Sequence, residues 1–69
     1  MTEILDLRGL PPPEPLVKTL EAAAALPVGE ELVVLTERCP VHLLPLLRER
    51  GLDVSTRELP GAHETRVRR

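Results

Sequence analysis

The sequence predicts an α+β fold: a two-layer α/β sandwich in which two helices cover one face of a mixed four-stranded sheet. Glycine and proline divide the 69 residues into six short segments, whose apolar patterns follow the order β-α-β-α-β-β. Hydrophobic residues make up 42% of the chain, as in a folded globular protein. Because a typical domain holds ~100–150 residues, we expect a single domain that spans residues 1–69.

The first half of the chain predicts a strand, a helix and a second strand. In residues 3–8, Leu5 and Leu7 alternate with charged side chains, which is typical of a strand, and a glycine follows. Residues 14–26 carry apolar side chains at three- and four-residue spacing, which predicts a helix. The apolar residues of this helix are Leu16, Val17, Leu20, Ala23 and Ala24, and we expect the first three to lie on the sheet. Residues 31–36 are a nearly continuous apolar run, which predicts a central strand.

The second half predicts one more helix and a β-hairpin. Proline is tolerated in the first turn of a helix but kinks its interior, so Pro45 places the helix start within residues 41–43, and the helix ends near Arg50. Residues 52–59 and 62–68 are predicted strands joined by a Pro-Gly turn. Alternation in the last strand places His63, Thr65 and Val67 on one face and Glu64, Arg66 and Arg68 on the other. We expect the first two strands to be parallel, with a right-handed crossover between them.

Composition narrows the classes of function. The net charge is −2 and there is no aromatic residue, so neither a strong basic excess nor a base-stacking platform is present. No apolar stretch approaches the ~20 residues that span a membrane, and no signal-peptide pattern is visible, so we expect a cytoplasmic protein. Asparagine and glutamine are absent, prolines number 8, and nearly all the positive charges are arginines. This bias is typical of a thermophile, and a GC-rich genome would produce much of it as well.

One segment carries a family resemblance. Residues 6–15, Asp-Leu-Arg-Gly-Leu-Pro-Pro-Pro-Glu-Pro, resemble the start of the TusA-like (SirA-like) sulfur-carrier family, whose hallmark is Cys-Pro-x-Pro shortly after a Gly-Leu. The Pro-x-Gly-Glu turn at residues 27–30 extends the resemblance, which covers nearly the whole chain. The positions that match the motif region are Gly9, Pro12, Pro13, Glu14 and Pro15, with Pro12 at the place of the cysteine.

The resemblance implies a two-layer fold with the same element order and a role in passing persulfide sulfur between partner proteins, chiefly for tRNA thiolation. Pro12 has no sulfur, so this chemistry cannot run through that residue. Pro13 and Pro15 keep their structural role, since proline pre-sets the entry into a helix. The first hypothesis is therefore a non-enzymatic TusA-like domain that acts by contact with protein partners in sulfur or redox metabolism.

Cys39 is the only thiol of the chain and supports a second hypothesis, a persulfide carrier that uses this residue. It lies between the apolar strand and the second predicted helix, at the edge where parallel strands end and where α/β sheets tend to place sites. The adjacent Arg38 and a helix N-terminus would both favour the thiolate. We expect Cys39 at the same edge as Pro12. The structural alternative is a small, half-buried residue before a proline.

A metal or cofactor site is not expected. Cys39 and His42 have Cys-x-x-His spacing, but a structural zinc needs four ligands, and only His63, Glu37 and Glu64 could add to the pair. We therefore expect the protein to be metal-free and to need no cofactor. The structural alternatives are a solvated His42 in the first turn of the helix and a His63 at the surface of the sheet.

Arginines concentrate in the C-terminal hairpin and support a third hypothesis, an anion- or RNA-binding module. The candidates are Arg57, Arg66 and Arg68, with Arg69 beside them. Glu58 and Glu64 interleave with them, and aromatic residues are absent, so a solvated strand face is favoured. The sequence thus favours a protein partner over nucleic acid or membrane, and it leaves the oligomeric state open.

Overall fold

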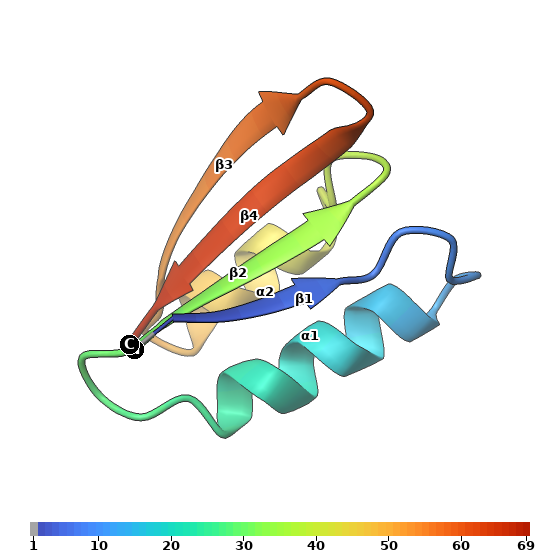
Figure 1. Cartoon of the computed structure of the whole chain (residues 1–69). Helices are drawn as coiled ribbons and strands as arrows, with labels where there is room; N and C mark the ends of the chain where they lie inside the picture. The colour runs from blue at the N-terminus through green and yellow to red at the C-terminus, as the bar shows by residue number, and fades with distance from the viewer. Residues whose placement is uncertain (1) are drawn as a thin grey trace.

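The computed structural model describes residues 2–69 and has the predicted order of elements in two layers (Figure 1). The strands are β1 (Thr2–Asp6), β2 (Glu31–Thr36), β3 (Asp53–Leu59) and β4 (Ala62–Arg68), and the helices are α1 (Glu14–Ala24) and α2 (Leu43–Glu49). Both helices lie on the same side of the sheet. None of the described helices is long and apolar enough to cross a membrane.

The sheet has the strand order β1-β2-β4-β3. β1 and β2 are parallel, with Ile4 beside Val33, and β4 is antiparallel to both of its neighbours. The C-terminal strand therefore lies in the middle of the sheet, between β2 and β3. β1 and β3 are its two edges.

The predicted segments differ from the observed ones by small shifts at their ends. β1 ends at Asp6, whereas the alternation predicted a strand as far as residue 8, because the chain turns at Arg8 and Gly9, just after the last bond from Leu7 to β2. α1 ends at Ala24, two residues earlier than its apolar pattern predicted. β2 has the predicted bounds, and β3 begins one residue later than predicted.

Prolines set the starts of both helices. α1 has proline at its second residue, where the missing N–H has no intrahelical partner in any case. α2 begins at Leu43, so Pro45 is its third residue, and the prediction that this proline belongs to the first turn is confirmed. The last turn of α2 is followed by Gly51, which has a positive φ of 78°, as is common just beyond the end of a helix.

The core lies between the helices and the sheet. Its buried residues are Leu7, Ala23, Leu26, Leu32, Val34, Leu43, Leu47, Leu52 and Val67. Val17 does not belong to it and is 45% exposed, so the expectation that Val17 lies on the sheet is wrong. Its neighbours Leu16 and Leu20 are only partly buried, because the face of α1 that meets the sheet is centred on Thr19 and Ala23.

Candidate functional site

An apolar groove opens where β1 and β2 end, between the starts of the two helices. Its volume is about 680 Å³. The lining residues are Leu7, Leu10, Pro12, Pro13, Pro15, Leu16, Thr36, Glu37, Arg38, Cys39, Pro40, Val41, His42 and Leu43. Two segments that are far apart in sequence thus supply one surface: the loop after β1 with the start of α1, and the loop after β2 with the start of α2.

Hydrogen bonds tie the two loops of the groove together. The N–H of Gly9 donates to Oε1 of Glu37 across 2.8 Å, and Gly9 has a φ of 87° that favours glycine at this turn. In the second loop, the Thr36 hydroxyl donates to the carbonyl oxygen of Arg38 at 2.6 Å. At the end of β1, the N–H of Leu7 donates to the Leu35 carbonyl at 2.9 Å. These hydrogen bonds hold the two loops that line the groove in place.

Three of the residues that match the TusA-like motif region line this groove. Pro12 is exposed and lines the groove together with Pro13 and Pro15. These side chains offer no hydrogen-bonding group, so this side of the groove can contribute only apolar contact. Glu14 opens α1 and does not line the groove.

Beside the groove, Arg8 and Asp6 form a local ion pair. The guanidinium of Arg8 donates to the Asp6 carboxylate at 2.9 and 2.8 Å, and the Arg8 backbone N–H adds a third hydrogen bond at 3.2 Å. These hydrogen bonds lower the pKa of Asp6 from 3.8 to about 2. The pair is exposed and stabilises the turn rather than the groove wall.

Cys39 lines the same groove as the proline run, at the same edge of the sheet as Pro12, as expected. Cys39 is exposed, whereas the structural alternative from the sequence was a half-buried residue. Its carbonyl oxygen accepts the N–H of Val41 at 2.9 Å, which holds the loop in a tight turn before α2. The thiol is thus open to solvent and to any molecule that enters the groove.

Cys39 also borders a second hollow, of about 730 Å³, on the side of β3 and β4. The lining residues are Glu37, Arg38, Cys39, Glu58, Leu59, Pro60, Gly61, Ala62 and His63. Cys39 therefore lies between the apolar groove and this more polar hollow and lines both of them.

The two histidines lie in different surroundings. His42 is exposed and precedes α2 as its N-cap residue, so it borders the helix instead of sitting in its first turn. His63 is half-buried, and Nε2 is buried without a hydrogen-bond partner. It lies on the same face of β4 as the core residue Val67, so the expectation of a His63 on the solvated surface of the sheet is wrong.

The structure does not bring the candidate metal ligands close enough together to bind one ion. Within residues 2–69 no group of three histidine, cysteine, aspartate or glutamate side chains is close enough to hold a metal ion. Glu37 accepts the N–H of Gly9, and Glu64 accepts hydrogen bonds from Arg57 and Arg66. Cys39 and His42 share the groove, and the other candidate oxygens and His63 do not complete a set around them.

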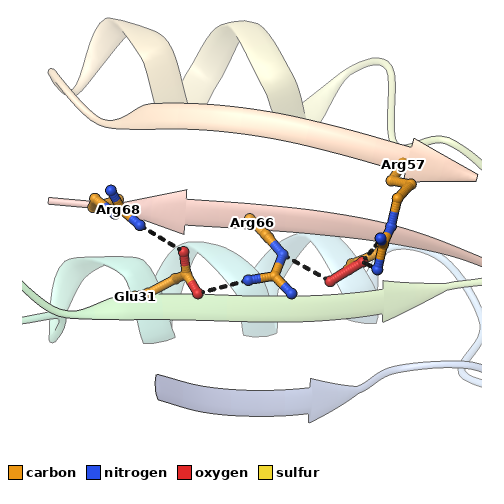
Figure 2. Close-up of polar contacts among 5 residues, drawn as sticks. Glu31, Arg57, Arg66 and Arg68 are labelled. Atoms are coloured by element: carbon orange, nitrogen blue, oxygen red, sulfur yellow. Dashed lines mark hydrogen bonds and ion pairs between the residues drawn. The ribbon is translucent and has the colours of Figure 1, made fainter. Parts of the chain in front are cut away.

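The arginines of the hairpin lie on the open face of the sheet, in a ladder of alternating charge (Figure 2). Arg66 donates to Oε1 of Glu31 and to Oε1 of Glu64, both at 2.9 Å. Arg57 donates to the other oxygen of Glu64 at 2.8 Å, and Arg68 donates to Glu31 at 3.2 Å. Three arginines thus share two glutamates across strands β2, β4 and β3.

The ladder explains how a carboxylate can be buried on this face. Glu64 is only 4% exposed, and although burial disfavours its charged form, hydrogen bonds and charges from Arg57 and Arg66 outweigh that effect, so its pKa lies below the ordinary value of 4.5. Each arginine already has a carboxylate partner, so an incoming phosphate would compete with these pairs. The anion-binding role of Arg57, Arg66 and Arg68 stays a prediction.

Two features of these surfaces went unnoticed in the sequence. The sequence suggests Glu37 only as a metal ligand, whereas in the structure its bond to Gly9 joins loops 28 residues apart. Glu31 was read as the first residue of a strand, and it anchors two arginines of the ladder. The alternation of glutamate and arginine in β4 was the one available signal for the ladder.

The element order and the strand order of the sheet define a small α+β domain with a SirA-like fold. The structure is similar to the crystal structure of a SirA-like protein from Desulfitobacterium hafniense, with a TM-score of 0.82 over 97% of this chain and 95% of that one. Sequence identity between the two is 22%, so the likeness concerns the fold. Comparison with curated proteins finds no match.

Residues 4–69 match the family described as "Uncharacterized conserved protein (DUF2249)". Because this match covers nearly the whole chain, the protein belongs to the DUF2249 family. The predicted α+β architecture and the SirA-like fold are therefore confirmed.

Proposed function

We propose that the protein is a non-enzymatic binding domain that recognises a protein partner through the apolar groove, in sulfur or redox metabolism. The observation that carries the proposal is the lining of the groove, which is mainly apolar and includes Val41 at 59% exposure. Exposed apolar surface in a concave site is typical of a binding surface. The SirA-like fold supports the link to sulfur metabolism.

The proline run supports binding over catalysis. Pro12 stands where the resemblance places a sulfur-bearing cysteine, and together with Pro13 and Pro15 it forms a wall with fixed backbone angles. A rigid wall loses little conformational entropy when a partner docks, so more of the contact energy remains as affinity. Such a wall suits a partner that inserts an apolar segment.

Site-specific photo-crosslinking in cells tests this proposal. A photoreactive residue at position 41 should capture one or a few proteins of sulfur or redox metabolism. The matched control is position 28, because Val28 is 85% exposed and lies in the loop between α1 and β2, at the opposite end of the sheet (Figure 1). Capture of the same proteins from both positions, or of none from position 41, would contradict the proposal.

A second candidate function is a persulfide carrier that uses Cys39. It is favoured by one observation: Cys39 is exposed and lines the same groove as Pro12. In the reaction, the Cys39 thiolate attacks the outer sulfur of a donor persulfide, the donor S–S bond breaks, and the donor cysteine leaves as a thiolate. Cys39 would then carry the persulfide to a protein docked at the groove.

Intact mass spectrometry separates the two functions. The protein is incubated with a cysteine desulfurase and cysteine under non-reducing conditions, with Cys39→Ser as the control. A binding domain gains no mass. A stable gain of one sulfur atom that is absent from Cys39→Ser would favour the carrier.

A further inference from the structure

The outer side of β1 is an open strand edge. β1 pairs only with β2 within residues 2–69, and it lies at the rim of the sheet (Figure 1). Each residue of a parallel ladder directs its N–H and its C=O to the same side. Because Leu7 donates to Leu35 of the β2 strand, the odd-numbered residues of this segment face β2. The backbone groups of Thr2, Ile4 and Asp6 therefore point outward.

This edge lacks several of the features that usually protect a sheet edge, and its charged residues are limited to Glu3 and Asp6. β1 contains no proline and no lysine, and its register with β2 runs without a bulge from Thr2 to Asp6. Its central residue, Ile4, is 66% exposed and lies on the open face, beside Val33. A second strand added here would gain hydrogen bonds and would cover Ile4.

We propose that the strand added at this edge is β1 of a second copy of the same chain, antiparallel and related by a two-fold axis at Ile4. In an antiparallel pair, outward-pointing residues exchange their hydrogen bonds with each other. A two-fold axis at Ile4 meets this condition, because it sets Ile4 opposite Ile4 and Thr2 opposite Asp6. It also sets Glu3 opposite Leu5 of the second copy. The two sheets then become one sheet of eight strands.

The charges near the edge complement each other in this arrangement. Leu16 lines the groove with Leu43 of the α2 helix, and Lys18 lies two residues further, about 200° around α1. Lys18 therefore occupies the flank of α1 away from α2, which is the flank beside the free edge of β1. Glu3 lies on the helix side of β1, because it shares that side with Leu5, which packs on the core.

Distances along the elements bring Glu3 of one copy to Lys18 of the other. Leu7 and Leu16 meet at the groove, and two strand residues span about as much length as four helix residues, roughly 6 Å. Leu5 is thus level with the turn of α1 that follows Leu16 and contains Lys18. Since Glu3 lies opposite Leu5 of the second copy, each Glu3 meets the other copy's Lys18, and the symmetric dimer contains this pair twice.

The rest of the interface is compatible with a second copy. Further along the same flank of α1 are Ala22 and Ala25, whose small side chains let a second helix approach closely. Asp6 is already paired with Arg8, so it brings no unpaired charge opposite Thr2. This interface is separate from the groove, which stays open for a partner.

Analytical ultracentrifugation of the full chain over a concentration series tests the proposal. We expect a reversible dimer that Ile4→Pro abolishes, because proline removes an outward N–H and leaves the bonds to β2 intact. Circular dichroism verifies that this variant is folded. Val28→Glu is the matched control, a charged substitution at an exposed valine away from β1, and it should leave the dimer unchanged.

Charge reversal provides a second, independent test. Glu3→Lys and Lys18→Glu should each weaken the dimer about two- to thirtyfold, because a pair worth about 1.4- to fivefold occurs twice. The double variant Glu3→Lys/Lys18→Glu should restore the affinity. A protein that stays monomeric at millimolar concentration, a dimer that survives Ile4→Pro, or a double variant as weak as the single ones would overturn the proposal.

Discussion

Replacing Pro12 by cysteine would put a thiol where the TusA-like resemblance places the carrier residue. Pro12 is exposed and has no N–H, so the change breaks no hydrogen bond of the folded protein. Its main effect is on the unfolded chain, which becomes less restricted. We therefore expect Pro12→Cys to lower the free energy of unfolding by at most about 1 kcal/mol.

Leu47→Ala provides the contrast. The Leu47 side chain is fully buried in the core cluster under the sheet. Its truncation removes apolar contacts and leaves a cavity, which costs about 2–5 kcal/mol. A domain of 69 residues has a total stability of roughly 3–10 kcal/mol, so Leu47→Ala removes a large share of it, and Pro12→Cys a small one.

Urea unfolding followed by circular dichroism measures both variants, because the chain has no aromatic residue to serve as a fluorescent probe. Val28→Ala is the neutral control, since this side chain is 85% exposed and should change stability by no more than about 0.5 kcal/mol. If Pro12→Cys destabilised the protein as much as Leu47→Ala, Pro12 would be part of the packed core. Pro12 would then not be an exposed residue in the wall of the groove.

Three further predictions concern the charged and polar groups. Glu64→Gln should be less stable than the wild type at neutral pH. That difference in the free energy of unfolding should shrink as the pH falls below 4.5, because the folded-state pKa of Glu64 lies below this ordinary value. For Asp6→Asn, the corresponding difference from the wild type should disappear between pH 3.8 and about pH 2. A Glu64 difference that is flat between pH 7 and 3 would contradict this. Elemental analysis of untagged protein should find no zinc or iron, and near-stoichiometric metal that His42→Ala removes would show that Cys39 and His42 bind it. Glu37→Ala should speed hydrogen exchange at the Gly9 amide, because it removes the side-chain oxygen that accepts this N–H, and unchanged exchange would show that this bond does not hold the loop.

The elements were predictable because their signals are local. The apolar run of residues 31–36 and the alternation of residues 62–68 set β2 and β4 with the correct bounds. Pro45 set the start of α2 through the loss of one N–H. Each of these inferences depends on a few neighbouring residues, and tertiary structure did not override them.

The errors arose where the answer depends on contacts across the fold. Val17 fits a helical apolar pattern as well as Leu16 does, and only the orientation of α1 on the sheet decides that it is exposed. Leu20, which the same pattern placed on the sheet, is only partly buried for the same reason. His63 was placed on the correct set of alternating residues, but which set faces the helices follows from pairing with β2.

The location of the candidate site was predictable from the sequence, but its lining and its hydrogen bonds were not. Topology alone puts Pro12 and Cys39 at one edge, since both follow parallel strands that end there. The apolar lining, the tie between Glu37 and Gly9, and the second hollow beside Cys39 depend on how the loops are folded. Short loops with several prolines carry no periodic signal from which such contacts could be predicted.

The two main surfaces of the domain have opposite chemistry, and this difference favours a protein partner at the groove over an anion at the open face. On the open face each arginine is already paired with Glu31 or Glu64, so a phosphate would have to compete with existing ion pairs. In the groove, apolar side chains are exposed to water, so covering them releases free energy without breaking an interaction. A partner that enters the groove also passes Cys39, the one thiol of the chain. Binding and sulfur transfer would therefore use the same docked complex, and the mass measurement on Cys39 decides which of the two the protein performs.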